Sequence, residues 1–75
     1  MVKYGVATEK LVLVDLDKRT ITTQDEEGRE WEYELSEDIE LDEKWIVDHL
    51  GEEITITYKE TEEAYIVLRI KELEG

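Results

Sequence analysis

Carboxylates are the only chemically active side chains that this chain supplies in number. Its 75 residues include 22 Asp and Glu, one histidine, one serine and no cysteine. Paired carboxylates act as general acid and base when their surroundings separate their pKa values. Pairs such as Asp15 with Asp17 and Glu62 with Glu63 are abundant, and no pattern marks a pocket that would bury one partner. We therefore expect solvated carboxylates with no catalytic residue among them, and predict that the chain is not an enzyme.

The single serine and the single histidine offer no further chemistry. A serine nucleophile needs a histidine base beside it, and no motif links Ser36 to His49. His49 has Asp48 and Glu52 as acidic neighbours, but neither spacing is a known metal-ligand pattern. The sequence therefore predicts no metal site, no cofactor and no small-molecule ligand.

The most regular acidic residues are Glu30, Glu32 and Glu34, which alternate with apolar residues over positions 30–35. Successive side chains of a strand point to opposite faces, so three glutamates would share a wet face opposite a core face. A dense acidic face can bind a basic protein or imitate the charge of nucleic acid. Glu30, Glu32 and Glu34 are therefore the candidate partner-binding residues, although such charge can also serve only to keep a small domain soluble.

Net charge excludes two classes of partner. Nine basic residues against 22 acidic ones give a formal charge of −13. Nucleic-acid binders neutralise phosphates with clustered Lys and Arg, and anionic membranes attract the same residues, so we expect neither partner. No apolar run approaches the roughly 18 residues of a membrane span, and none follows the first residues as in a signal peptide. A cytoplasmic location is predicted, or cytoplasmic recombinant expression for a designed chain.

Hydrophobic periodicity predicts five strands that would position these groups. A long first strand, bent at Gly5, should cover 2–16. Gly28 should supply the positive φ of the turn before the third strand. In the last strand Ile66, Leu68 and Ile70 are expected to face the core. The other strands are expected at 20–23, 30–35, 54–58 and 64–73.

One short helix is predicted near 42–50, where the alternation breaks. Asp42 is placed as its N-cap and Gly51 as the residue that follows its end. Trp45, Ile46 and Leu50 would form its buried stripe.

The order strand, strand, strand, helix, strand, strand, in a single domain over residues 1–75, resembles the OB-fold. This resemblance implies a mainly β, five-stranded barrel whose long first strand pairs into both halves. A Src-homology-3-like barrel is the competing architecture, but its helical turn lies between the last two strands. OB-folds bind ligands on the outer face of strands two and three, using aromatic and basic side chains. The residues predicted on that face are neither aromatic nor basic: Thr20, Thr22, Gln24, Glu30, Glu32 and Glu34.

The chain also resembles de novo designed small β-barrels in its outward glutamates, its capped helix and its lack of cysteine and phenylalanine. That resemblance implies a non-enzymatic scaffold without a natural activity. The alternative is a natural acidic binding module with a basic protein partner, or a nucleic-acid mimic. Charged residues on strand edges guard against pairing with other chains. Because Lys59, Glu60, Arg69 and Lys71 are predicted at such edges or turns, a monomer is expected.

Overall fold

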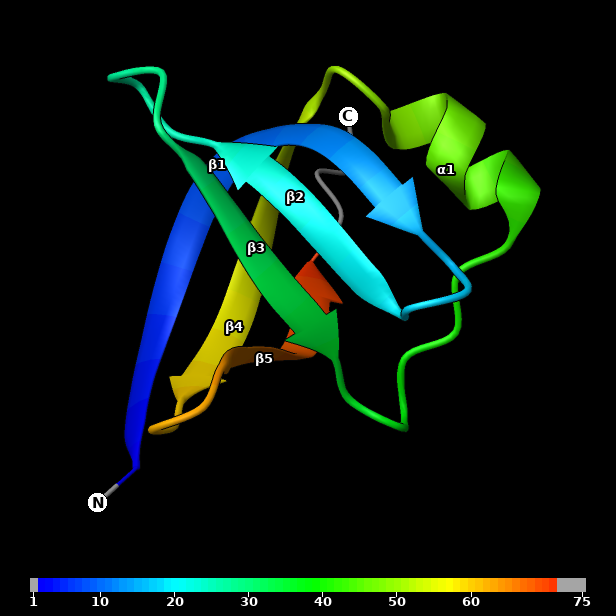
Figure 1. The fold of residues 1–75 in the computed structure, drawn as a ribbon. Coiled ribbons are helices and arrows are strands. Elements are labelled where there is room, and N and C mark those ends of the chain that lie inside the picture. Colours follow the sequence, from blue (N-terminus) through cyan, green and yellow to red (C-terminus); the bar gives the residue numbers. More distant parts are fainter. Residues whose placement is uncertain (1, 72–75) are drawn as a thin grey trace.

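The computed structural model describes residues 2–71, which form a closed five-stranded barrel and one short helix (Figure 1). The strands are ordered β1-β2-β3-β5-β4, and β4 returns to pair with β1. Of the strand pairs in the described part of the chain, β3 with β5 is the parallel one. The predicted fold class, mainly β with the order βββαββ and one short helix, is confirmed. The last two residues of the predicted fifth strand, 72 and 73, lie outside the described residues. The elements are β1 (Lys3–Asp15), β2 (Thr20–Gln24), β3 (Glu30–Leu35), α1 (Glu43–His49), β4 (Glu53–Glu60) and β5 (Tyr65–Lys71).

β1 is shared between two neighbours, as the resemblance implied. Residues 3–10 pair with β4, and residues 10–15 pair with β2. The register toward β2 shifts between Leu11 and Leu13, which makes Val12 the extra residue of a β-bulge. The predicted irregularity therefore lies at Val12, whereas the pairing runs without interruption through Gly5. At Gly5 the missing Cβ makes room for a ring, because a Cβ there would lie 2.6 Å from the end of the Tyr58 side chain.

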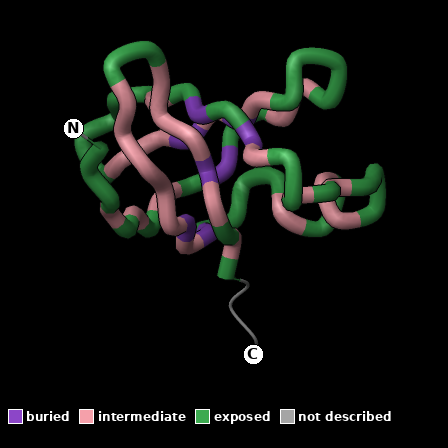
Figure 2. Tube along the Cα trace, turned by 90° about the horizontal axis from the view of Figure 1, so that it is seen from below, coloured by how far each residue is buried: buried purple, intermediate pink, exposed green. Residues whose placement is uncertain are grey.

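Alternating residues of the strands fill the barrel interior. In β3 the prediction is confirmed, since Tyr33 and Leu35 are buried, Trp31 packs against the core, and the glutamates between them are exposed. Figure 2 shows the buried residues as short stretches on several strands. The buried hydrophobic side chains are Leu11, Ile21, Tyr33, Leu35, Ile54, Ile56 and Val67.

β5 departs from the predicted alternation. Val67 and Arg69 pair with neighbouring residues of β4, Tyr58 and Thr57. Leu68, which lies between them, therefore has no partner and is the extra residue of a β-bulge. A bulge reverses the faces of the residues on either side of it. Val67 is therefore completely buried and Ile70 packs against the core. The prediction that Ile66, Leu68 and Ile70 together form the inner face is wrong, because it assumed an unbroken period of two.

α1 is capped as predicted but is less buried than predicted. The Asp42 carboxylate accepts the backbone N–H of Trp45 at 2.8 Å, and Gly51 follows the helix with a φ of +85°. Trp45 packs against the core, yet no residue of the helix is fully buried and Leu50 is 44% exposed. The predicted stripe is therefore confirmed only in part, because Trp45 and Ile46 are half-buried whereas Leu50 is exposed. Within residues 2–71, no helix has the length and apolar character needed to cross a membrane.

Candidate functional site

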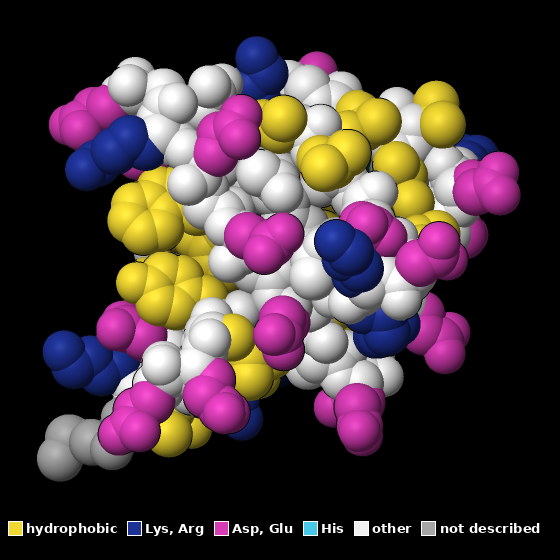
Figure 3. Space-filling model, viewed as in Figure 1, with side chains coloured by type: hydrophobic (Ala, Val, Ile, Leu, Met, Phe, Trp, Pro, Cys, Tyr) yellow, Lys and Arg dark blue, Asp and Glu magenta, His cyan; other side chains and the backbone are white. Residues whose placement is uncertain are grey.

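Glu30, Glu32 and Glu34 form a row on the outer face of β3, and all three are exposed. Alternate residues of a strand are separated by about 6.6 Å, so the row presents carboxylates at a regular spacing. Figure 3 looks onto β2 and β3, and acidic side chains are spread over the face in view. The neighbours of the row on β2 are uncharged: Gln24, Thr22 and Thr20, in that order.

The acidic row, meaning Glu30, Glu32 and Glu34, has no basic partner among residues 2–71. The ion pairs found within residues 2–71 lie in the β2–β3 turn and along α1. None of them includes a residue of the acidic row. Its three charges therefore act on the solvent and on any partner without local neutralisation.

The wall formed by β1, β4 and β5 has the opposite character. The register places Tyr4 beside Lys59, Val6 beside Thr57, and Thr8 beside Thr55. The Thr8 and Thr55 hydroxyl oxygens lie 2.9 Å apart on this face. β5 adds the outward positions Ile66, Arg69 and Lys71. The next outward pair in this register is Lys10 beside Glu53, so these eleven positions carry four basic side chains and one acidic one.

The β2–β3 turn fixes the start of the acidic row through Asp25. Its carboxylate accepts the backbone N–H groups of Glu27 and Arg29, both at 2.9 Å, and the Trp31 indole N–H at 3.0 Å. These donors, with the Trp31 indole first, lower the pKa of Asp25 to about 2. Gly28 has the predicted positive φ, +86°, and its N–H donates to the Asp25 carbonyl. Sequence reasoning located this turn but missed the role of Asp25 as its acceptor.

A carboxylate inside the barrel was also missed. Glu9 accepts hydrogen bonds from the Thr23 hydroxyl at 2.6 Å and from the Tyr33 phenol at 3.2 Å. Burial raises the pKa of the Tyr33 phenol, and the nearby Glu9 charge adds to the effect. Counting back in twos from Leu11 would have placed Glu9 inside. Within residues 2–71, no buried side-chain nitrogen or oxygen lacks a hydrogen-bond partner.

Four aromatic rings pack against one another next to the Tyr33 phenol that donates to Glu9. The Tyr33 ring lies 5.5 Å from that of Tyr58 and 5.8 Å from that of Tyr65. Tyr65 also stacks with Tyr58 at 5.6 Å and with Trp31 at 6.1 Å. Such separations are those of mutually packed rings, so this group belongs to the structure of the barrel.

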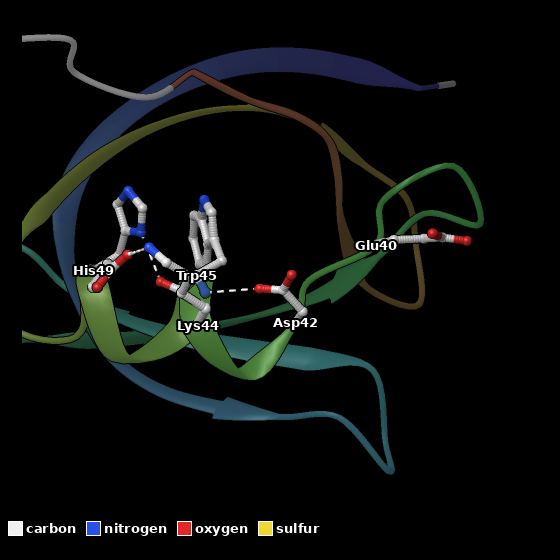
Figure 4. A pocket seen from close by; sticks show the side chains of 6 residues that line it. Glu40, Asp42, Lys44, Trp45 and His49 are labelled. Atoms are coloured by element: carbon white, nitrogen blue, oxygen red, sulfur yellow. Dashed lines mark hydrogen bonds and ion pairs between the residues drawn. The ribbon is translucent and has the colours of Figure 1, made fainter.

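The hollow beside α1 gathers the polar groups of the helix (Figure 4). The His49 ring stacks on Trp45 at 4.2 Å, and His49 Nδ1 donates to the Trp45 carbonyl at 2.7 Å. Lys44 pairs with Asp48 at 2.8 Å, and this hydrogen bond lowers the pKa of the Asp48 carboxyl. Figure 4 shows Glu40 lying apart from the others. The residues of this hollow are therefore engaged with their own helix and do not converge on a common point.

Across residues 2–71, no three His, Asp or Glu side chains are arranged to hold a metal ion.

No protein-family model, no curated protein and no solved structure matches this chain. The geometry of the chain itself therefore carries the functional inference.

Proposed function

We propose that this chain is a non-enzymatic, OB-like barrel that acts as an acidic binding module for a basic protein partner. The observation that supports the proposal is the acidic row itself: three exposed carboxylates in register on one strand, without an ion pair in the described residues. β2 pairs with β3 along Glu30–Glu34, and β5 pairs with β3 at Glu34 and Leu35, so the backbone that carries the row is already ordered before a partner binds.

The distribution of charge favours this wall as the contact surface. The opposite wall, from β1, β4 and β5, carries four basic side chains and one carboxylate at its aligned outward positions: Lys10, Lys59, Arg69 and Lys71, against Glu53. A basic partner would be repelled there and attracted to β2 and β3. Complementary fields of this kind steer encounters and fix orientation more than they add affinity.

A scaffold without a partner, natural or designed, is the competing proposal. It is supported by the interior and helix polar groups, which are used in folding: Glu9 by Thr23 and Tyr33, and Asp42 by the helix N-terminus. On this proposal the acidic row contributes only solubility.

Two triple variants with equal changes in net charge distinguish these proposals. The first replaces Glu30, Glu32 and Glu34 by glutamine; the matched control replaces Glu37, Glu62 and Glu63, which are also exposed. Polylysine serves as the defined probe, titrated at low and at moderate salt. Three exposed ion pairs with polylysine, at about 0.5 kcal/mol each, predict a roughly tenfold loss of affinity for the first variant. The control variant should lose less affinity.

Equal losses of polylysine affinity in the two variants would show that only net charge matters and would favour the scaffold proposal. Both variants should fold, because removing like charges from a surface relieves repulsion. A pull-down from cell extract at the same two salt concentrations then asks whether a natural basic protein is retained by the wild type and not by the first variant.

A further inference from the structure

The end of β1 carries exposed apolar side chains on the same wall as the acidic row. Leu13 is 57% exposed and Val12 is 38% exposed. Val47 of α1 and Leu50 at its C-cap are exposed as well. On the face in view in Figure 3, hydrophobic side chains gather over the end of β1 and beside α1. Scattered hydrophobic residues on a surface need no explanation, whereas a contiguous group rimmed by polar residues marks an interaction surface.

The β-bulge of β1 is the reason why two of these side chains face the solvent. The register against β2 passes from Leu11 opposite Thr23 to Leu13 opposite Thr22. Val12 and Leu13, the apolar pair, therefore oppose one residue of β2 together. Leu11 is completely buried, and an unbroken alternation from it would turn Leu13 inward as well. Bulges that re-aim a side chain in this way are frequent beside functional sites.

Three aligned rows of outward side chains cross this wall from β1 through β2 to β3. Two strand spacings, about 9 to 10 Å, separate the backbone of β1 from that of β3. This outer β1–β3 face therefore has the apolar pair on one margin, uncharged side chains along β2, and the acidic row on the other margin. The middle row is Leu13, Thr22 and Glu32, and the rows beside it are Lys10, Gln24 and Glu30, and Asp15, Thr20 and Glu34.

Charge decides which occupant the outer β1–β3 face fits. Its nine aligned outward positions carry four carboxylates and one ammonium group. Such a face repels a second copy, whose formal charge is −13, and it repels an anionic membrane for the same reason. A basic partner is attracted, and the apolar pair offers it a contact that charge alone does not use.

We propose that the basic partner docks an amphipathic helix along β2, with its apolar side chains over the apolar pair and its Lys or Arg side chains over the acidic row. This inference rests on the proposed function and names the partner's chemistry. A helix is about 10 Å wide, which matches the separation of β1 from β3. β2 has five residues, so it is about 17 Å long, the length of roughly three helical turns. Basic residues four apart on a helix repeat every 6 Å or so, close to the spacing of about 6.6 Å in the acidic row.

The separation of the two margins favours a helix over an extended segment. An extended segment that lies on a sheet points only its alternate side chains toward that sheet, in a single line. It cannot cover an apolar margin and an acidic margin that are about 9 to 10 Å apart. A helix presents an apolar stripe and a basic stripe side by side on its surface, and so reaches both.

Two synthetic peptides of identical Leu, Lys and Ala composition test the docking. Each has about 12 residues, or roughly 18 Å as a helix. The first places Leu and Lys on adjacent helical stripes, and the second scrambles them. We expect the first to bind the full chain at least fivefold more tightly at moderate salt, where screening weakens charge alone. Equal affinities, or a bound peptide without helical structure by circular dichroism, would overturn the proposal.

Polylysine keeps this test separate from that of the proposed function. If the two peptides bind equally while polylysine binding still depends on the acidic row, only the helix proposal fails. If polylysine binding does not depend on the acidic row, the proposed function fails, and the helix proposal fails with it.

Leu13→Ser tests the apolar margin, and Val6→Ser is the matched control. Val6 is also an exposed apolar residue of β1, but it lies on the wall shared with β4. Leu13→Ser should weaken the amphipathic peptide about fivefold and leave polylysine binding unchanged, because only the peptide covers the leucine. Val6→Ser should change neither. Equal effects of the two variants on the peptide, or an equal loss of peptide and polylysine in Leu13→Ser, would contradict the assigned face.

Sedimentation and vesicle binding examine the other occupants of the same face. The full chain should remain a monomer, and it should not bind phosphatidylcholine vesicles. A dimer that Leu13→Ser dissociates would assign the face to a second copy and overturn the proposal. Vesicle binding that Leu13→Ser abolishes would overturn it in favour of a lipid surface.

Discussion

The barrel interior has two parts that are stabilised in different ways. The aliphatic core is completely or almost completely buried and contains no polar side-chain atom. The aromatic cluster is joined to a carboxylate through Tyr33 and depends on hydrogen bonds and on the placement of its rings. The aliphatic core consists of Leu11, Ile21, Ile54, Ile56 and Val67. The aromatic cluster consists of Trp31, Tyr33, Tyr58 and Tyr65, with Glu9 hydrogen-bonded to it at Tyr33 and Thr23 hydrogen-bonded to Glu9.

This difference predicts how each part tolerates change. An aliphatic core accepts substitutions that conserve volume, because burial is proportional to area and has no direction. A buried polar network loses more when one member is removed, because the remaining members are left without partners. The aromatic cluster should therefore be the part whose residues are strongly coupled to one another.

The largest effect is expected from Glu9→Leu. The change leaves the completely buried Thr23 hydroxyl and the Tyr33 phenol without their acceptor. Leaving a buried donor unpaired costs about 1 to 3 kcal/mol, so the free energy of unfolding should fall by about 2 kcal/mol or more. Urea denaturation followed by tryptophan fluorescence measures the loss. Glu32→Leu, the same substitution on the wet face of β3, is the control and should change stability by less than about 0.5 kcal/mol.

A triple variant converts the polar group into more of the aliphatic core. Adding Thr23→Val and Tyr33→Phe to Glu9→Leu removes the two hydroxyl donors that Glu9→Leu leaves without an acceptor. Replacing all partners of a buried polar network by apolar groups is often nearly neutral. Stability should therefore return to within about 1 kcal/mol of the wild type. A triple variant as unstable as Glu9→Leu would show that packing, and not hydrogen bonding, distinguishes the two parts.

A smaller effect is expected from Gly5→Ala. The new methyl group would lie 2.6 Å from two atoms at the end of the Tyr58 ring. That ring also packs on Tyr33 and Tyr65, so it has little freedom to move away. Overpacking of this kind costs about 1 kcal/mol or somewhat more. Urea denaturation again gives the free energy of unfolding.

A double-mutant cycle identifies the cause of that cost. In a Tyr58→Leu background, Gly5→Ala should cost little, because the shorter side chain no longer covers the glycine. The coupling energy should then account for most of the single-variant effect. An undiminished cost in the double variant would mean that Gly5 is required for its backbone freedom and not for the contact with Tyr58.

The regular parts of the chain could be predicted because burial follows periodicity there. Glu30, Glu32 and Glu34 alternate strictly with apolar residues, and both faces of β3 follow from that pattern. Asp42 and Gly51 likewise define the ends of α1 by local chemistry. The order of these elements was enough to predict the fold class. The acidic row was placed on the outer face for the same reason.

The irregular parts could not be predicted because their determinants are non-local. The bulge at Leu68 depends on how β4 pairs with β5 and reverses the faces that the alternation assigns. The alternation that ends at Leu11 assigns Glu9 to the inner face, but only its position relative to Thr23 and Tyr33 explains why a carboxylate is tolerated there. The second edge of β1 at residues 3–9 is unpaired because the pairing with β2 begins at Lys10. The bulge, the partners of Glu9 and this edge leave no signal in the local sequence.

The smallest effect that we predict concerns the acidic turn at the margin of the aromatic cluster. Folding lowers the pKa of Asp25 from 3.8 to about 2, because its carboxylate accepts hydrogen bonds, first from the Trp31 indole. Its stabilisation is therefore fully present above the unfolded value and is lost as the pH falls through the folded value. Asp25→Asn should be less stable than the wild type at neutral pH, and this difference should vanish toward pH 2.

Urea midpoints of both proteins across this pH range measure the difference, and the Trp31 indole N–H resonance follows the Asp25 carboxyl directly. Glu26→Gln, in the same turn, is the control and should show no such convergence with the wild type. An indole resonance that titrates near the ordinary value of 3.8 would show that Trp31 does not hold Asp25 in its charged form. The turn would then be independent of the aromatic cluster, and the network of coupled groups would end at Tyr33 and Tyr65.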